Sequence, residues 1–279
     1  MTFTGTDDIT PDRALALLDD MTGIVARASA ATLMTHFSDV ERRTKDDQSP
    51  VTAADERSEA AILDGLSRIL PGVPVIAEES AARAPARVDG SCAIVDPLDG
   101  TKEFLAGRDE FTVNVAIVTR GVPIAGVISA PAQGLVWRGV VGHGAERLRM
   151  RWQDGMSGAT ERTAIRTRAT PADGLVAAIS RSHLDPQSEA FLSGRGVSRR
   201  YGCGSSVKFC HIAQGDADIY PRLAPTCEWD IAAGCAILTA AGGAVTDPGG
   251  APLRFADGKA KFLVPGFVAW GDPAGARSG

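Results

Sequence analysis

The sequence predicts an α/β protein built in layers, with two lobes and an active site in the cleft between them. Three observations lead to this prediction. Residues 11–70 carry helix patterns, residues 73–148 hold short apolar runs separated by Gly and Pro, and strand and helix patterns alternate from about residue 157. They indicate a first lobe of paired helices on a mostly antiparallel sheet and a smaller second α/β lobe. The boundary falls in the segment MSGATER, so the predicted lobes span residues 1–155 and 156–279.

The composition indicates a chain with its own core and no surface for nucleic acid. With 279 residues and 44% hydrophobic content, the chain is long enough for one large domain or two lobes sharing a core. A formal charge of −5 argues against the basic face that a nucleic-acid-binding protein carries. Five cysteines without a C-x-x-C pair favour buried, reduced thiols. No leader opens the chain and no apolar run reaches the ~20 residues that cross a bilayer, so we expect a cytoplasmic protein.

Two helices are predicted at the N-terminal end. The first covers residues 11–37, begins with a Thr-Pro pair and has an apolar stripe through Leu15, Leu18, Val25 and Ala28. After a charged segment that we expect to be a loop or an edge, Thr52 caps a second helix that ends at Leu70. Asp55 lies in the first turn of that helix, where the helix dipole favours a carboxylate whatever else it does.

Strands dominate the middle of the chain. The apolar runs VPVIAEES (73–80) and CAIVDPLDG (92–100) both end in acidic residues, so charge is expected at the ends of two strands. Residues 111–148 hold three more apolar runs with turn residues between them, which is typical of an antiparallel meander. The second lobe then alternates strands, such as LVAAIS (175–180), with helices, such as the one beginning at CEWDIAAG (227–234).

The segment AIVDPLDGTKEF (93–104) contains the densest group of oxygen donors in the chain. Pro97 lacks an N–H and restricts Asp96 to extended geometry, so we expect the strand to end at Asp96 and the backbone to turn. Asp96, Asp99 and the carbonyl of Leu98 then form a compact set of oxygen donors, which suits a hard cation such as Mg²⁺. If TKEF opens a helical turn, the N–H groups of Gly100 and Thr101 would face an anion.

Taken alone, this segment is better explained as an acidic surface turn in which Asp serves as a cap. Two further acidic sites strengthen the case for a metal. Glu78 and Glu79 follow another predicted strand, and Asp230 opens a predicted helix. The three acidic sites would form one pocket if the fold brings these ends together.

The motifs EES, DPLDGTKEF and EWDIAAG, in this order, closely resemble the Mg²⁺-dependent, lithium-sensitive phosphomonoesterases typified by inositol monophosphatase. The resemblance spans nearly the whole chain and implies a layered α/β/α/β/α sugar-phosphatase fold. Within this superfamily, SPVTAAD, ISRSH, GSSVKFC and DADIYPRL resemble the 3'(2'),5'-bisphosphate nucleotidase branch, which acts in bacterial sulfur assimilation. Inositol monophosphatases carry threonine and asparagine where this chain has Lys102 and Glu103.

The resemblance implies roles for the acidic residues and two or three Mg²⁺ ions. Glu78, Asp96 and the carbonyl of Leu98 would hold one ion, and Asp96, Asp99 and Asp230 a second. Glu79 would support these ligands or a third ion. Asp55 and the hydroxyl of Thr101 would orient the attacking water. Charge favours the same assignment, because clustered carboxylates without metal would repel one another and a phosphate dianion.

The resemblance also implies a nucleotide pocket in the second lobe. The expected substrate contacts, in addition to Gly100 and Thr101, are His183, Ser205, Lys208 and Arg222. The two cations would suit the nonreacting 5'-phosphate. Singly, each residue has a simpler explanation as a cap, a loop residue or a solvated charge. The expected reaction is hydrolysis of the 3'-phosphate of adenosine 3',5'-bisphosphate, and possible substrates include its sulfated form.

Several alternatives stay open at this point. The same fold would also serve hydrolysis of inositol 1-phosphate or fructose 1,6-bisphosphate. Ile231 and the segment 81–90 depart from many relatives, so the substrate preference is less closely determined than the chemistry. A nucleotide sensor without turnover is a remote alternative. A D-x-D-x-T aspartyl-phosphate motif, a P-loop and an EF-hand loop are all absent from the sequence. A homodimer is compatible with the sequence, which does not fix the oligomeric state.

Overall fold

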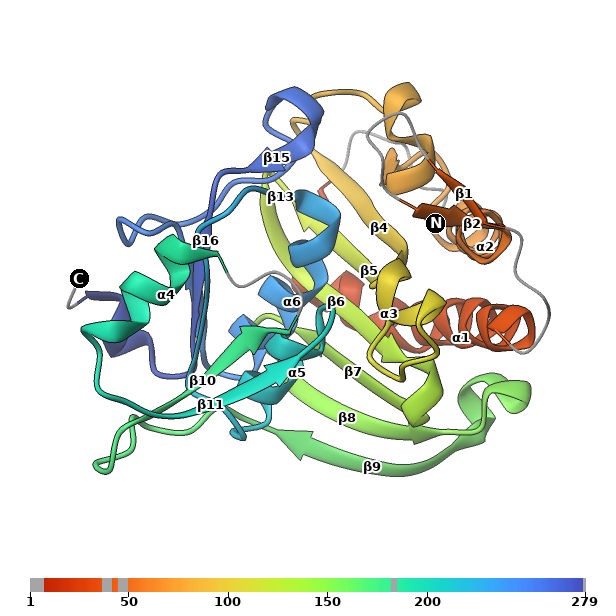
Figure 1. Cartoon of the computed structure of the whole chain (residues 1–279). Coiled ribbons are helices and arrows are strands. Elements are labelled where there is room, and N and C mark those ends of the chain that lie inside the picture. The colour runs from red at the N-terminus through yellow and green to blue at the C-terminus, as the bar shows by residue number, and fades with distance from the viewer. Residues whose placement is uncertain (1–7, 37–41, 45–49, 182–184, 278–279) are drawn as a thin grey trace.

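The computed structural model describes residues 8–36, 42–44, 50–181 and 185–277, and in Figure 1 they form a layered α/β molecule. The first layer consists of α1 (Pro11–His36) and α2 (Ala53–Ile69). Both predicted helices are confirmed. Within the predicted stripe, Leu18, Val25 and Ala28 are buried, but Leu15 is 44% exposed, so its assignment to the stripe was wrong. A small antiparallel pair, β1 (Arg42–Thr44) and β2 (Pro50–Thr52), precedes α2.

The second layer is a seven-stranded sheet in which the strands follow one another in chain order. Its first two strands are parallel and all later pairs are antiparallel, which confirms the predicted meander. The strands are β3 (Val75–Ala77), β4 (Ser91–Asp99), β5 (Thr112–Thr119), β6 (Val122–Ala130), β7 (Leu135–Val140), β8 (Gly144–Met150) and β9 (Ala159–Ile165).

Both faces of this sheet are covered. Side chains alternate along a strand, and in β5 Val113 and Val115 pack with α1 and α2, while Ala116 and Val118 pack toward the second lobe. Because both sets are buried, β5 is apolar nearly throughout rather than alternating with polar residues.

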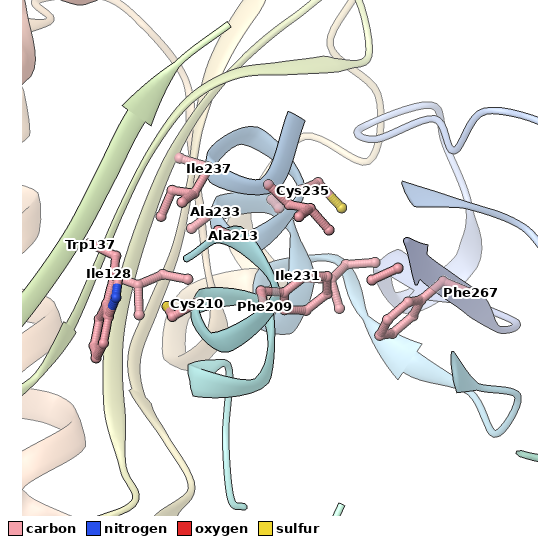
Figure 2. Close-up of a cluster of buried hydrophobic side chains, with 14 of the residues drawn as sticks. Ile128, Trp137, Phe209, Cys210, Ala213, Ile231, Ala233, Cys235, Ile237 and Phe267 are labelled. Carbon is pink, nitrogen blue, oxygen red and sulfur yellow. The ribbon is translucent and has the colours of Figure 1, made fainter. Parts of the chain in front are cut away.

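The third layer consists of α5 (Val207–Ala213) and α6 (Glu228–Ala240), which lie between the two large sheets. In Figure 2, Phe209, Cys210 and Ile231 on these helices stand between Ile128 and Trp137 on one side and Phe267 on the other. The helix α6 comes very close to β6, since a Cβ added to Gly126 would lie 2.4 Å from the carbonyl oxygen of Ala233. Glycine is therefore required at this crossing.

The fourth layer is a five-stranded sheet in the order β11-β10-β12-β16-β14, and the fifth is α4 (Pro186–Ser193). Residues of α4, β10, β12 and β16 form a separate apolar cluster on the outer face of this sheet. The strands are β10 (Leu175–Ser180), β11 (Val197–Cys203), β12 (Ile219–Arg222), β14 (Ala244–Thr246) and β16 (Phe267–Trp270). The alternating α/β/α/β/α order agrees with the predicted architecture.

The remaining elements are short. They are α3 (Thr101–Leu105), the pair β13 (Thr226–Cys227) and β15 (Leu263–Val264), and the 3₁₀ helices η1 (Glu78–Arg83), η2 (Pro131–Gln133), η3 (Trp152–Gly158), η4 (Ala260–Phe262) and η5 (Pro273–Arg277). The division of the chain at residues 155 and 156 stays a prediction. The strand β9 begins after it yet pairs with β8 of the first sheet, and α6 packs on that sheet as well.

All five cysteines lie in the described part of the chain and are free, as expected. Four of them are buried, whereas Cys227 is half-buried, so the expectation of burial was wrong for that residue. Among the described residues, no helix has the length and apolar content to span a membrane.

Candidate active site

A cavity of about 270 Å³ lies where the edge of the first sheet meets α5, α6 and β12. Eight of the predicted site residues line it: Glu78, Asp99, Gly100, Thr101, Ser205, Lys208, Arg222 and Asp230. Asp55, Asp96 and Leu98 are buried, each at 1% exposure. His183 falls outside the described residues. Segments far apart in the sequence thus supply one cavity.

The strand β4 reaches the cavity through a bulge. Asp96 pairs with Asn114 and Asp99 with Thr112, so two residues of β4, Pro97 and Leu98, stand opposite a single residue of β5. The prediction that the strand ends at Asp96 was therefore wrong. A bulge tolerates proline because the residue there need not donate a ladder hydrogen bond.

Four carboxylates from three elements converge beneath this bulge: Glu78, Asp96, Asp99 and Asp230, which we call the acidic cluster. Burial raises the pKa of Asp96 well above its usual value, and the negative charges of the other three members raise it further. Burial, followed by the charge of Asp99, raises the pKa of Asp230 to about 6. All donors in the cluster are oxygens, which fits a hard divalent cation better than a soft one.

The carboxylates of the cluster are held by hydroxyl and amide donors. Asp99 Oδ2 accepts from Ser206 Oγ at 2.7 Å, Asp230 Oδ2 accepts from the hydroxyl of Thr226, and Asp96 Oδ1 accepts from the N–H of Leu98 at 3.0 Å. Within the part of the chain that the structure describes, no three acidic, His or Cys side chains stand at ready-made metal spacing. The cluster therefore has the donor chemistry for a cation, but in this arrangement its oxygens accept protein hydrogen bonds.

Asp55 and Thr101 lie together as predicted. The hydroxyl of Thr101 is within 3.4 Å of Asp55 Oδ1 and 3.2 Å of the carbonyl oxygen of Leu98, and its single proton serves one of them at a time. Ser58 Oγ donates to the carbonyl of Pro97 at 2.7 Å, which ties α2 to the bulge. The carboxylate in the first turn of α2 is thus fixed against the end of β4.

The second lobe contributes the turn Cys203–Ser206, which we call the Ser205 turn. Ser205 is in the left-handed region with φ of 43°, which is uncommon for a residue other than glycine. Its hydroxyl is buried and has no hydrogen-bond partner among the described residues. Lys208, the second residue of α5, donates to the carbonyls of Cys203 and Ser205.

Arg222 lies at the end of β12 and lines the same cavity. Burial opposes its charge, but the neighbouring Tyr220, Asp230 and Asp99 outweigh this effect and raise the pKa of the guanidinium. The cavity therefore has a cation facing a largely acidic floor.

Sequence reasoning missed several residues of the site. Ser206 Oγ lies 2.7 Å from Asp99 Oδ2 and 2.8 Å from the carbonyl oxygen of Asp230, and it accepts from Asn114 Nδ2 at 3.0 Å. Nothing in the sequence distinguishes Ser206 from Ser205 beside it. Arg181 forms a bidentate ion pair with Glu110, and Glu110 accepts from the N–H of Gly204. That pair joins positions 71 residues apart, so no local pattern could reveal it.

Comparisons with known proteins agree with these observations. Residues 17–267 match the sequence model described as the inositol monophosphatase family. The chain is 40% identical over 225 residues to the 3'(2'),5'-bisphosphate nucleotidase CysQ of Escherichia coli (strain K12), covering 80% of this chain and 86% of that protein. It is 38% identical over 229 residues to the protein of the same name from Salmonella typhimurium, covering 82% and 88%.

Solved structures give the same picture. The crystal structure of CysQ from Bacteroides thetaiotaomicron aligns with a TM-score of 0.72 and 35% identity over 90% of this chain and 96% of that one. An inositol monophosphatase from Anabaena aligns with a TM-score of 0.72 but 24% identity, over 94% and 93% of the two chains, and it supports the fold alone.

Proposed function

The chain belongs to the inositol monophosphatase family, as its acidic motifs predict, and we propose that it is a metal-dependent phosphomonoesterase acting on adenosine 3',5'-bisphosphate. Hydrolysis of the 3'-phosphate would release adenosine 5'-monophosphate and inorganic phosphate. The observation that carries the chemistry is the convergence of the four buried or half-buried carboxylates of the acidic cluster at one cavity. The names of relatives at 38–40% identity over most of the chain support the substrate.

The acidic cluster would hold the metal. Glu78, Asp96 and the carbonyl of Leu98 would hold one Mg²⁺, and Asp96, Asp99 and Asp230 a second, with Glu79 available for a third. When bound, Mg²⁺ supplies a Lewis acid that lowers the pKa of a water and offsets the charge of the phosphate. The fit rests on the donor set, which consists of oxygens only and is too acidic to accept a phosphate dianion without compensating cations.

Asp55 and Thr101 would handle the proton of the attacking water. The buried Asp55 carboxylate can accept a hydrogen bond from the Thr101 hydroxyl, so that hydroxyl can in turn accept one from a water facing the phosphorus. The water oxygen forms the new P–O bond, the bond from phosphorus to the ribose 3'-oxygen breaks, and the ribose oxygen leaves with a proton. The N–H groups of Gly100 and Thr101 would hold the phosphoryl oxygens.

The second lobe would recognise the rest of the nucleotide. Ser205 offers a buried hydroxyl without a protein partner in the described part of the chain, and Arg222 offers a cation for the nonreacting 5'-phosphate. Lys208 also lines the cavity and is a further proposed substrate contact. For His183 the substrate contact stays a prediction.

A direct assay tests this proposal. Phosphate release with Mg²⁺ is compared for adenosine 3',5'-bisphosphate, inositol 1-phosphate and fructose 1,6-bisphosphate, with a chelator-treated sample as control. We expect kcat/KM for the nucleotide to exceed that of inositol 1-phosphate by about 10-fold or more, because inositol 1-phosphate has no second phosphate for a charge-assisted contact, and to exceed that of fructose 1,6-bisphosphate, which has a second phosphate but no adenosine. A preference for either alternative substrate would reassign the specificity, and binding without any turnover would indicate a sensor.

Four further properties belong to the same proposal. The substrate class would place the protein in the cytoplasm and in sulfur assimilation, and lithium would compete with Mg²⁺. A homodimer is also proposed, and light scattering on the purified chain would test it.

A further inference from the structure

The helix α2 presents three polar side chains to three separate segments of the site. Asp55 lies beside the hydroxyl of Thr101, and Ser58 donates to the carbonyl of Pro97. The third is Glu59, which follows Asp55 by four residues and therefore lies one turn further along the same face of the helix. Neither the acidic cluster nor the proposed chemistry uses Glu59.

Glu59 caps the 3₁₀ helix η1 from outside that helix. It is 6% exposed, and its Oε2 accepts the backbone N–H of Glu79, the second residue of η1, at 2.8 Å. An oxygen that accepts the N–H of the second or third residue is what caps the start of a helix. The residue that precedes η1 is Ala77, which has no side-chain oxygen for this bond and is itself fully buried. The cap is therefore supplied by α2, from a position 20 residues before Glu79.

This contact lies directly beside a proposed metal ligand. The strand β3 runs in register with β4 up to the pair Ala77 and Val95, so Glu78 follows the last residue of β3 just as Asp96 follows Val95. After burial, the charge of Glu78 is the next cause that raises the pKa of Asp96. Beyond Ala77 the ladder ends, and the direction of Glu78 depends on how η1 begins. Glu59 fixes that beginning, since it holds the N–H of the residue that follows Glu78.

The chain beyond η1 is held separately. The N–H of Val88 donates to the carbonyl of Ala256 at 2.9 Å, and Arg87 forms a bridge with Asp257. The segment that contains η1 is thus held on both sides, and Glu59 holds the side that carries the acidic residues.

We propose that Glu59 is a positioning residue that caps η1 and thereby fixes Glu78 and Glu79 for the metal, and that its carboxylate does not itself bind the ion. The part of this inference that concerns metal binding rests on the proposed function, whereas the cap itself does not. The role requires an acceptor oxygen at the right reach rather than a negative charge. Glu59→Gln should therefore preserve it.

Two conservative variants separate reach from charge. Glu59→Gln keeps the length of the side chain and an acceptor oxygen but removes the charge, whereas Glu59→Asp keeps the charge but shortens the side chain by one methylene. The affinity for Mn²⁺, used as the probe ion, is measured without substrate from the electron paramagnetic resonance signal of the free ion. We expect Glu59→Asp to weaken Mn²⁺ binding by about 10- to 100-fold, the effect of losing a group that orients a metal ligand. Glu59→Gln should stay within about threefold of wild type.

A control variant and a substrate measurement accompany this titration. Asp272→Ala removes a carboxylate that accepts the backbone N–H of Thr170 at 3.2 Å in the second lobe, and it should leave the Mn²⁺ affinity unchanged. At saturating Mg²⁺, KM for adenosine 3',5'-bisphosphate should stay within about threefold of wild type in both Glu59 variants, because Glu59 lies outside the lining of the cavity. The reverse order, with Glu59→Asp close to wild type and Glu59→Gln impaired, would mean that the negative charge acts on the ion directly, and would overturn the proposal. Unchanged Mn²⁺ affinity in Glu59→Asp would overturn it as well.

Hydrogen exchange of the full chain without metal or substrate tests the cap by itself. The amide of Glu79 should exchange about 10-fold or more faster in Glu59→Asp than in wild type, and at the wild-type rate in Glu59→Gln and Asp272→Ala. Unchanged exchange in Glu59→Asp would show that Glu59 does not cap η1. If wild type binds no Mn²⁺ or hydrolyses no phosphate ester, the proposed function fails, but this measurement still decides whether Glu59 is the cap. If Glu59→Asp fails to fold, Glu59→Gln carries the comparison: wild-type Mn²⁺ affinity and exchange there would support the proposal, and about 10-fold weaker binding or faster exchange would contradict it.

Discussion

The acidic cluster and the Ser205 turn face the same cavity but are built in opposite ways. The cluster consists of like charges that, together with burial, raise the pKa values of Asp96 and Asp230, and it stands on the end of a buried strand and the start of a helix. The turn consists of neutral hydroxyls and a strained backbone, held by Lys208 and by Glu110 of the first lobe. The carboxylates of the cluster repel one another, and a cation would relieve that repulsion. The polar groups of the turn, apart from the Ser205 hydroxyl, already have hydrogen-bond partners. We therefore expect the cluster to determine whether catalysis occurs and the turn to determine how well the substrate is aligned.

The largest expected effect is in the acidic cluster. Asp99→Asn should lower kcat by about 1,000-fold or more, since it removes a charged ligand from the site that activates the water. Phosphate release at saturating substrate and Mg²⁺ measures this effect. Asp64→Asn, which changes an exposed carboxylate of α2, serves as the control and should have wild-type activity. If kcat fell by less than about 10-fold, the essential charge would lie elsewhere, which would contradict the expectation that the cluster determines whether catalysis occurs.

Ser206→Ala tests the point where the two regions meet. It removes the donor to Asp99 and leaves the Asn114 amide without its acceptor, so we expect kcat to fall by about 10- to 100-fold. Ser205→Ala, the neighbouring control, should instead raise KM by about three- to tenfold with little change in kcat, because its hydroxyl has no protein partner in the described structure. Equal effects of the two alanines on kcat and KM would remove the distinction between the two hydroxyls.

A smaller effect is expected at the ion pair that joins the lobes. Arg181→Gln and Glu110→Gln should each raise KM by about three- to fivefold, since the pair is bidentate but partly exposed to solvent. Because both residues act through the N–H of Gly204, the double variant should be no worse than the more impaired single variant. A double-mutant cycle on KM measures this coupling. Strictly multiplicative effects would show that the pair does not position the Ser205 turn.

The two regions also differ in how far the sequence predicts them. The elements follow from apolar runs, turn residues and caps, and the alternating layer order follows from the family resemblance. The acidic cluster follows from residue types at element ends, supported by family motifs. The bulge at Pro97 was missed because the same proline is compatible with a strand end or with a bulge. The partners of Lys208 and Ser206 could not be predicted, because they depend on the left-handed φ of Ser205 and on a contact with residue 110 that only the folded chain creates.

The smallest expected effect concerns a carboxylate just outside the acidic cluster. Glu228 is fully buried two residues before Asp230, yet it accepts from the N–H of Ala256 and has one oxygen without a partner among the described residues. Burial raises its pKa from 4.5 to about 7. The folded protein then binds more protons than the unfolded chain between about pH 4.5 and 7, so this group's contribution to stability is present at low pH and is lost as pH rises through 7.

In wild type with saturating Mg²⁺, which holds the charge of the cluster constant, Tm should fall by a few degrees between pH 5.5 and 8. Glu228→Gln should reduce that fall, whereas the control Glu189→Gln, at a half-buried carboxylate that is paired with Arg200, should not. Parallel pH curves for wild type and Glu228→Gln would show that Glu228 does not titrate in this range and that other groups cause the pH dependence of Tm.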